Sequence, residues 1–377
     1  MGGKGIFYKI FMGVDPMLML SVVFIAVFGI SAMSSLDNNV FVTKQSTWLI
    51  IAALVFIVSS FIDYRFLRRS TIVTIVYAGT AAVLATMFII GSSFQGAQSW
   101  VDFGSFAVQP SEFAKLATIL ILAKYFSRRH MEIASIRHII VSGVYAFIIF
   151  FLILLQPDFG SAMIIAFIWF GMVLASGISK RHIAALFIMA LVVIAGAWQF
   201  AFQDYQKSRI VSFIHPLADI QGVGYNAYQS TIAVGSGGLI GKGLGYGTQS
   251  KLKFLPEYET DFIFAAYAEE WGFAGVIILF IFFSIIIWRL LYFASKGVTN
   301  FETLFTVGVA SLFISHFFVN VGMNIGLLPV TGVTLPFMSY GGSHLVAEAL
   351  ALGIVTAMYR YSRTVHPDQL NREFLGV

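Results

Sequence analysis

Long apolar runs alternate with short polar connections along almost the whole chain. An α-helix needs about 20 predominantly apolar residues to cross the hydrocarbon core of a bilayer. The pattern therefore predicts about ten transmembrane helices, in an all-α polytopic membrane protein that forms a single domain, residues 1–377. The predicted spans lie at residues 17–35, 46–62, 71–91, 110–126, 138–155, 161–177, 183–201, 262–288, 303–323 and 345–361.

The composition agrees with this prediction and excludes some chemistry. Hydrophobic residues make up 58% of the chain and charged residues only 11%, whereas about a quarter of the residues of a soluble protein are charged. The absence of cysteine excludes disulfides, thiolate nucleophiles and cysteine-ligated metals. Asp15 and Pro16 form a good helix start for the first span. This span is too long for the core of a signal peptide, so we expect a retained anchor.

The net charge of +5 is arranged as a topology signal. Most of the 23 Lys and Arg residues lie in the two tails and in the connections that follow spans 2, 4, 6 and 8, whereas the opposite short connections hold almost none besides Lys44. Cytoplasmic loops are enriched in Lys and Arg, so we expect both termini in the cytoplasm. The basic balance then reflects topology, and no nucleic-acid partner is expected.

The connection between spans 7 and 8, residues 202–261, is far longer than a simple link requires, and loops of this length are usually functional. By the same topology it is extracytoplasmic. It holds a glycine run at 222–249 that is not a phosphate-binding P-loop, because Gly243 follows Lys242 where that motif needs Ser or Thr. Two interpretations remain open. The glycines provide tight turns with positive φ, or their N–H groups surround an anionic headgroup together with Lys242 and Arg209.

A second outer stretch, GAQSWVDFGSFAVQPSEFAK, leads into span 4. Pro110 suits the first position of a helix, and Glu112 and Lys115 are three residues apart, so they can pair on one helix face. An ordinary ion pair at a helix start is one interpretation. Lys115 lies about one turn inside an apolar span, however, and ionisable residues there are functional candidates. Trp100 is either an interfacial anchor or a platform for a sugar.

Two further segments belong to the same side. In QPDFGSA, Asp158 is a candidate cap for span 6. The apolar stretch 322–343 is broken by prolines and glycines, and irregular backbone at membrane depth needs protein or a water-filled cavity around it. We therefore expect a re-entrant segment that lines a pocket, and a groove formed where residues 92–110, 202–261 and 324–344 meet.

Acidic residues concentrate in FLPEYETDFIFAAYAEEWG, residues 254–272, where span 8 begins. Asp261 is either an N-cap or a general base that the helix dipole keeps ionised and that takes a proton from a sugar hydroxyl. Glu269 and Glu270 lie deeper in the span and must face the protein interior or a polar cavity.

Five stretches together closely resemble the SEDS family (shape, elongation, division and sporulation), the RodA and FtsW proteins. They are GAQSW…QPSEFAK, QPDFGSA, GYNAYQSTIAVGSGGLIGKG, GTQSKLKFLPEYETDFIFAAYAEEWG and LPVTGVTLPFMSYGGS. The likeness covers almost the whole chain and is stronger to RodA than to FtsW. Two positions depart from the family pattern: Glu259 stands where histidine is common, and His344 where serine is usual.

The resemblance implies a peptidoglycan glycosyltransferase of the bacterial cytoplasmic membrane that joins lipid II into β-1,4-linked strands at the outer face. It also implies a class B penicillin-binding protein as partner. Asp261 matches the essential aspartate of the family, and Trp100, Glu112 and Lys115 match other functionally important positions. Ser343, at the end of the last motif, is a further candidate for substrate binding.

In that reaction Asp261 deprotonates the acceptor hydroxyl, and Arg209, Lys242 or Lys115 offsets the charge of the departing pyrophosphate. The sequence leaves open whether a divalent cation, Mg²⁺ or Mn²⁺, assists. A lipid II flippase and a division-type, FtsW-like polymerase are the alternatives, as is a transferase of the O-antigen ligase kind. A flippase needs a polar path across the membrane, whereas the polar motifs here gather on the outer side.

Overall fold

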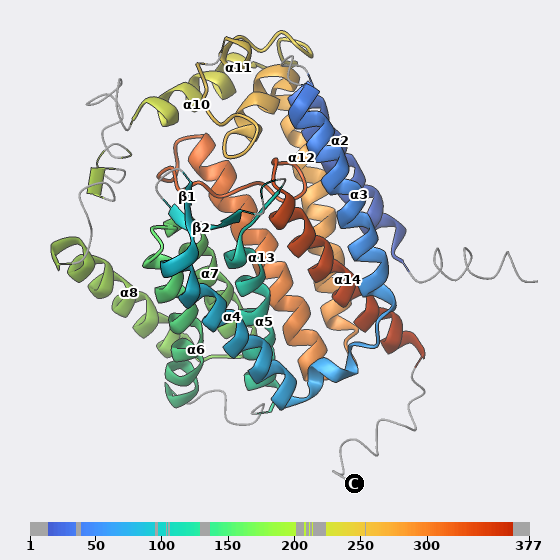
Figure 1. Ribbon diagram of the computed structural model, residues 1–377, viewed down its shortest axis with the longest axis vertical. Helices are drawn as coiled ribbons and strands as arrows, with labels where there is room; N and C mark the ends of the chain where they lie inside the picture. The colour runs from blue at the N-terminus through green and yellow to red at the C-terminus, as the bar shows by residue number, and fades with distance from the viewer. Residues whose placement is uncertain are drawn as a thin grey trace, which may run out of the picture.

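The structure is a computed structural model that describes residues 14–34, 39–94, 97–102, 104, 106–128, 136–200, 207, 208, 211, 213, 224–252 and 254–364. Within this part of the chain, ten long helices form one bundle, with two short helices and a small sheet at one end (Figure 1). The long helices are α2 (Pro16–Ser34), α3 (Asn39–Phe61), α4 (Ser70–Ile90), α5 (Pro110–Ser127), α6 (Ile136–Leu154), α7 (Phe159–Ala175), α8 (Lys180–Phe200), α12 (Ile263–Ser295), α13 (Asn300–Asn324) and α14 (Gly342–Thr364).

Each long helix coincides with one predicted span, so the prediction of an all-α polytopic membrane protein is confirmed. Among the described residues, seven helices are long and apolar enough to cross a membrane by length and composition alone. Helix α7 is apolar but has only 17 residues, and α5 carries Glu112, Lys115 and Lys124. The predicted cytoplasmic position of both termini falls on residues 1–13 and 365–377, which lie outside the described residues.

Helices α5 and α13 form the centre of the bundle. Helix α13 packs against α5, α7 and α12, while α5 also contacts α4, α6 and α7. Helix α14 lies along α3, and α12 lies along α2 (Figure 1). Most residues of α5 and α13 are buried, so polar side chains on these two helices are enclosed by protein.

The helix starts follow simple capping chemistry. Asp15 accepts a hydrogen bond from the N–H of Leu18 at 3.0 Å, and it also pairs with Arg289 of α12. Helix α5 begins at Pro110, as the sequence predicts. At the far end of the bundle a short 3₁₀ helix, η1 (Tyr64–Arg68), joins α3 to α4. There the hydroxyl of Tyr64 donates to Glu302 at 2.6 Å.

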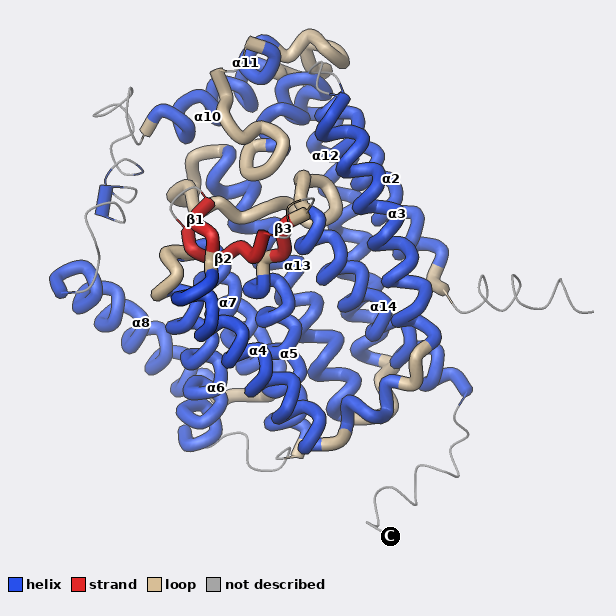
Figure 2. Tube along the Cα trace, viewed as in Figure 1, coloured by secondary structure: helices blue, strands red, loops and turns tan. Residues whose placement is uncertain are grey.

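A three-stranded antiparallel sheet follows α4, in a region that the sequence analysis treats as a loop. Its strands are β1 (Ser92–Phe94), β2 (Ala97–Asp102) and β3 (Ala107–Val108), in the order β1-β2-β3. Figure 2 shows these strands in red near the start of α5. They are too short to give an alternating pattern that stands out from a turn-rich stretch. We call the end of the bundle that carries this sheet the site end.

The long connection between α8 and α12 also reaches the site end. Its described part contains α10 (Tyr225–Ser236) and α11 (Thr248–Lys251). Gly238, Gly241, Gly243 and Gly245 all have positive φ, which confirms that the glycine run provides tight turns. At Gly241 an added Cβ would also lie 2.0 Å from a backbone oxygen of α12, so the loop packs directly on that helix.

Between α13 and α14 the backbone is irregular over residues 325–341, as the sequence predicts. Val333, Leu335, Phe337 and Met338 are each less than 5% exposed. Protein therefore surrounds most of this segment, which is the condition under which irregular backbone is tolerated at membrane depth.

Candidate active site

A buried cluster of ionisable side chains joins three helices at the site end. Lys115 donates to Glu112 at 2.7 Å, which confirms the predicted pairing, and both residues are buried. The same ammonium group lies 3.1 Å from Nε2 of His316 on α13. The second carboxylate oxygen of Glu112 lies 3.0 Å from Nδ1 of His344 on α14.

The hydrogen bonds fix the roles of the two rings. An ammonium group only donates, so Nε2 of His316 accepts from Lys115, and Nδ1 of His316 donates to the carbonyl of Thr334 at 3.1 Å. A carboxylate only accepts, so Nδ1 of His344 is protonated and donates a hydrogen bond to Glu112. Every member of the cluster is thereby paired, which is what buried charge requires.

This cluster also bears on the question, left open by the sequence, of whether a divalent cation assists. Ligand atoms of Glu112, His316 and His344 lie within 4.8 Å of one another, a donor set that suits a transition metal. Lys115, however, bonds two of these three residues, and its ammonium group stands where a cation would bind. The set therefore does not fit a resident metal ion as long as Lys115 is charged.

A stripe of buried polar residues on α13 connects this cluster to Asp261. His316, Asn320 and Asn324 follow one another at intervals of four, so they share one face of the helix. Asn320 donates to the carbonyls of Val333, at 2.7 Å, and of Asp261, at 3.0 Å. Asn324 donates to the Asp261 carbonyl as well, also at 3.0 Å. The stripe thus fixes the backbone of Asp261 one helical turn from the ionisable cluster.

The backbone around Asp261 is held from a second side. Helix α12 begins at Ile263, with Phe262 at the capping position, so the N-cap interpretation of Asp261 is wrong. The hydroxyl of Ser339 donates to the carbonyl of Thr260 at 2.6 Å. The N–H of Tyr340 donates to the carbonyl of Glu259 at 2.8 Å.

The carboxylate of Asp261 faces the irregular segment. A Cβ placed on Gly332 would lie 3.4 Å from Oδ2 of Asp261, and Gly332 has a φ of 73°. A side chain at position 332 would therefore contact the Asp261 carboxylate, and glycine avoids that contact.

The predicted outer stretches meet near the start of α5. Asp158 caps α7 by accepting the N–H of Ser161 at 3.0 Å, and its other oxygen accepts from the side chain of Gln109 at 3.0 Å. Ser343 accepts the N–H of Gln109 at 3.0 Å and donates to the carbonyl of Ala107. These hydrogen bonds join the segment before α5, the start of α7 and the start of α14, which are distant in the sequence. The hydroxyl of Ser343 forms two of them.

The remaining candidates have different surroundings. Trp100 is half-buried in β2. Lys242 forms an ion pair with Glu269 of α12 at 2.7 Å, so its ammonium group bonds a carboxylate of the protein itself. Arg209 lies outside the described residues. Glu269 and Glu270 are buried, as the sequence predicts.

Glu269 anchors the long loop to α12. Its two oxygens accept from Lys242, from the N–H of Thr248 at 2.8 Å, and from the N–H of Gln249 at 3.1 and 3.2 Å. The loop N–H groups of Lys242 and Gly243 bond the carbonyls of Glu269 and Glu270, each at 3.0 Å. Helix α12 is interrupted just beyond, at Gly272, whose φ is 66°.

Asn320 and Asn324 of the polar stripe were not among the residues predicted to be functional. Asn320 and Asn324 lie inside a predicted span, and polar residues there are expensive unless they serve a purpose. Their spacing from His316 was the available signal, because intervals of four place all three on one helix face.

Comparison with known proteins identifies the family of this chain. The family model for cell cycle proteins of the FtsW, RodA and SpoVE type matches residues 8–364. The chain therefore belongs to this family of multi-pass membrane proteins, the SEDS family.

Relatives of known name lie within the same family. The chain is 38% identical over 296 residues to the peptidoglycan glycosyltransferase MrdB of Escherichia coli (strain K12), with 76% of this chain and 80% of MrdB covered. It is also 38% identical over 283 residues to the probable peptidoglycan glycosyltransferase FtsW of Thiomicrospira cyclica, with 72% and 71% covered. A solved chain from a peptidoglycan synthase complex that coordinates polymerisation and crosslinking superposes with a TM-score of 0.80 at 29% identity, covering 93% and 99% of the two chains.

Proposed function

We propose that this protein is a peptidoglycan glycosyltransferase that polymerises lipid II at the outer face of the bacterial cytoplasmic membrane. The observation that supports this most is the double anchoring of the Asp261 backbone, by Asn320 and Asn324 on one side and by the segment of Ser339 and Tyr340 on the other. Such rigidity is what a general base needs, because proton transfer requires a fixed distance to the reacting hydroxyl.

In the proposed reaction Asp261 accepts the proton of the acceptor's sugar hydroxyl as that oxygen attacks the anomeric carbon of the donor. One displacement inverts the configuration at that carbon, and the undecaprenyl pyrophosphate leaves. Lys115 is the cation that we assign to offset the developing charge. Its ammonium group bonds Glu112 and contacts His316, one turn of α13 from Asn320, which bonds the Asp261 carbonyl. Trp100 and Ser343 line the same end and remain candidates for substrate binding, as does Arg209.

The charge distribution along three central helices favours this function over a flippase. Helix α13 has no charged residue between Glu302 and His316, and α14 has none between Glu348 and Arg360. Between Lys115 and Lys124, α5 has none either. The middle of each of these three helices therefore carries no charged residue. A flippase needs a polar path across the membrane, so this pattern suits chemistry at one membrane face better than transport.

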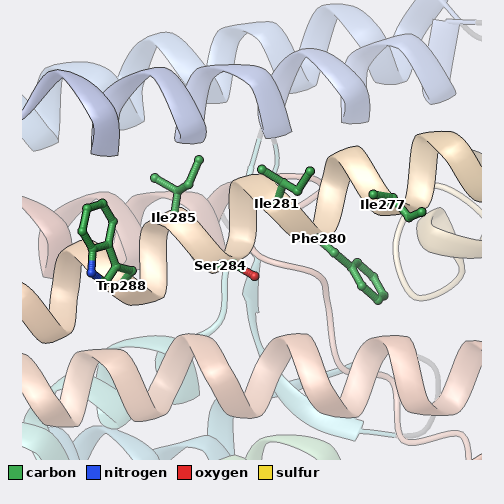
Figure 3. Close-up of a pocket in the computed structure, with 6 residues that line it drawn as sticks. All are labelled: Ile277, Phe280, Ile281, Ser284, Ile285 and Trp288. Atoms are coloured by element: carbon green, nitrogen blue, oxygen red, sulfur yellow. The ribbon is translucent and has the colours of Figure 1, made fainter.

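We propose a class B penicillin-binding protein as partner, and an apolar hollow on α12 offers a place for its transmembrane helix. Figure 3 shows the six residues that line this hollow, from Ile277 to Trp288. They recur every three or four residues, so they form one stripe along the helix. The indole of Trp288 lies at one end of the stripe. The next residue, Arg289, pairs with Asp15 just before α2.

The test is strand synthesis by the purified full-length protein with a class B penicillin-binding protein and labelled lipid II. We expect long glycan strands on a gel when both proteins are present. Lipid II transport is assayed in parallel with the same protein in vesicles, by the access of an external enzyme to labelled lipid II. Transport without strands would overturn the proposal in favour of a flippase.

A further inference from the structure

The buried network of Lys115 and Glu112 extends to two residues of α14, His344 and Glu348. His344 contacts Glu112 through Nδ1, and its Nε2 lies 2.9 Å from Oε1 of Glu348, one turn further along the helix. This second contact is not aligned as a hydrogen bond, so it acts through charge and proximity. Glu348 is 3% exposed, and none of the roles assigned so far involves it.

The other oxygen of Glu348 supports a strained residue in the irregular segment. Oε2 accepts the N–H of Phe337 at 3.0 Å. Phe337 has a φ of 59°, a conformation that a bulky residue keeps only where its surroundings impose it. Its ring stacks on Phe313, with the centroids 5.6 Å apart. Glu348 and Phe313 together therefore determine the backbone at this point.

The segment that follows Phe337 is the one that holds the backbone next to Asp261. Ser339 and Tyr340 bond the carbonyls of Thr260 and Glu259, the two residues immediately before Asp261. A displacement of Phe337 is therefore passed on, through two residues of buried backbone, to the segment that carries the proposed base.

We infer that Glu348 is a positioning residue for Asp261. Its carboxylate fixes Phe337, and His344 connects this support to the pair of Glu112 and Lys115. The base and the cation of the proposed site are thus set by one continuous network across α5, α13 and α14. The inference rests on the proposed function, because a displaced Asp261 changes a rate only if Asp261 takes part in the reaction.

Two substitutions separate positioning from charge. Glu348→Ala removes the acceptor for the N–H of Phe337, whereas Glu348→Gln keeps an oxygen acceptor and removes only the charge. A shift of about 1 Å in a reacting group can cost on the order of 10²-fold in rate. We expect Glu348→Ala to lower kcat for strand synthesis at least about tenfold while KM for lipid II stays within about twofold. Glu348→Gln should remain within about threefold of the natural protein.

Glu302 provides the matched control. It is also buried, on α13, and it accepts hydrogen bonds from Tyr64 and from the N–H of Val298 at the end of the bundle opposite the site. We expect Glu302→Ala to lower the unfolding temperature without a selective fall in kcat. An equal fall in kcat for Glu302→Ala and Glu348→Ala would overturn the inference, because it would mean that Glu348 affects the rate only through the stability of the fold.

Hydrogen exchange provides a readout independent of activity. We expect Glu348→Ala to accelerate exchange in peptides that cover residues 335–341, and Glu348→Gln to leave it near the natural rate. Unchanged exchange in Glu348→Ala, or a kcat close to that of the natural protein, would overturn the inference. If the natural protein forms no strands, the proposed function fails instead, while the exchange experiment still decides whether Glu348 holds Phe337.

Discussion

The side-chain amide of Asn324 donates a 3.0 Å hydrogen bond to the main-chain carbonyl of Asp261. The oxygen of the same amide accepts the N–H of Ala265 at 3.2 Å and the hydroxyl of Ser230 at 3.1 Å. One residue of α13 therefore joins the segment before α12, the first turn of α12 and helix α10. Asn324 is fully buried, so these bonds have no competition from water.

Asn324→Ala leaves the N–H of Ala265 without its acceptor and removes one of the two side-chain amides that bond the Asp261 carbonyl. We expect a loss of about 1–3 kcal/mol in the free energy of unfolding, since that is the usual cost of an unsatisfied buried polar group. Strand synthesis should fall further than stability explains, because the Asp261 carbonyl keeps only one of its two bonds to α13. Ser230→Ala removes only the contact with α10 and is the control. If strand synthesis falls in proportion to the loss of stability in both Asn324→Ala and Ser230→Ala, the assigned role of Asn324 is contradicted.

The ion pair of Glu112 and Lys115 gives a second prediction. Lys115→Met leaves Glu112 buried beside His344 alone, and breaking a buried pair costs about 3–5 kcal/mol. The double change Lys115→Met and Glu112→Gln removes both charges and should recover part of the lost unfolding temperature. Neither variant should form strands, because the cation near Asp261 is gone. A single variant that melts like the natural protein would show that the pair contributes little.

The helices were predictable because their signal is local: each of the ten apolar runs predicted as a span coincides with a helix. The pairing of Glu112 with Lys115 was predictable for the same reason, since a spacing of three fixes it within one helical turn. The contacts of Glu112 with His344 and of Asn320 with Asp261 join residues far apart in the chain. They depend on how α5, α13 and α14 pack, and a single sequence does not contain that information.

Asp261 illustrates the limit at a single residue. Its place after Thr260 and just before an apolar run suggested a helix cap as readily as a base. The structure moves the helix start to Ile263, because the turn that contains Glu257, with a φ of 51°, continues through Phe262. No local pattern distinguished these two boundaries, since the cap and the turn use the same residue types.

Glu269 holds the long loop, and its removal should release that loop. In Glu269→Ala the N–H groups of Thr248 and Gln249 lose their acceptor, so we expect faster trypsin cleavage at Lys251. Lys242→Met removes the ion pair and a hydrogen bond to the hydroxyl of Thr248. It is expected to have a smaller effect, because the N–H groups of Thr248 and Gln249 still bond the Glu269 carboxylate. Equal protection of the natural protein and Glu269→Ala would contradict this role.

The apolar hollow on α12 should be sensitive to bulk if a partner helix occupies it. Ile281→Trp fills the stripe between Phe280 and Ile285, and we expect reduced co-purification with the penicillin-binding protein at an unchanged unfolding temperature. Ile75→Trp on α4 places the same side chain at another exposed apolar position and should leave co-purification intact. Loss in both variants, or in neither, would contradict docking at this hollow.

The central claim is that Asp261 is the general base, and Asp261→Asn tests it most directly. The change is nearly isosteric, and the bonds from Asn320 and Asn324 go to the main chain of Asp261, so the fold should persist. The measurement is the rate of strand synthesis from labelled lipid II by the full-length protein with its partner, with Glu259→Gln as the control. We predict a fall on the order of 10²-fold or more for Asp261→Asn, because an amide cannot accept the proton, and a much smaller loss for Glu259→Gln. Near-normal synthesis by Asp261→Asn, together with a large loss in Glu259→Gln, would contradict the account and assign the base to Glu259.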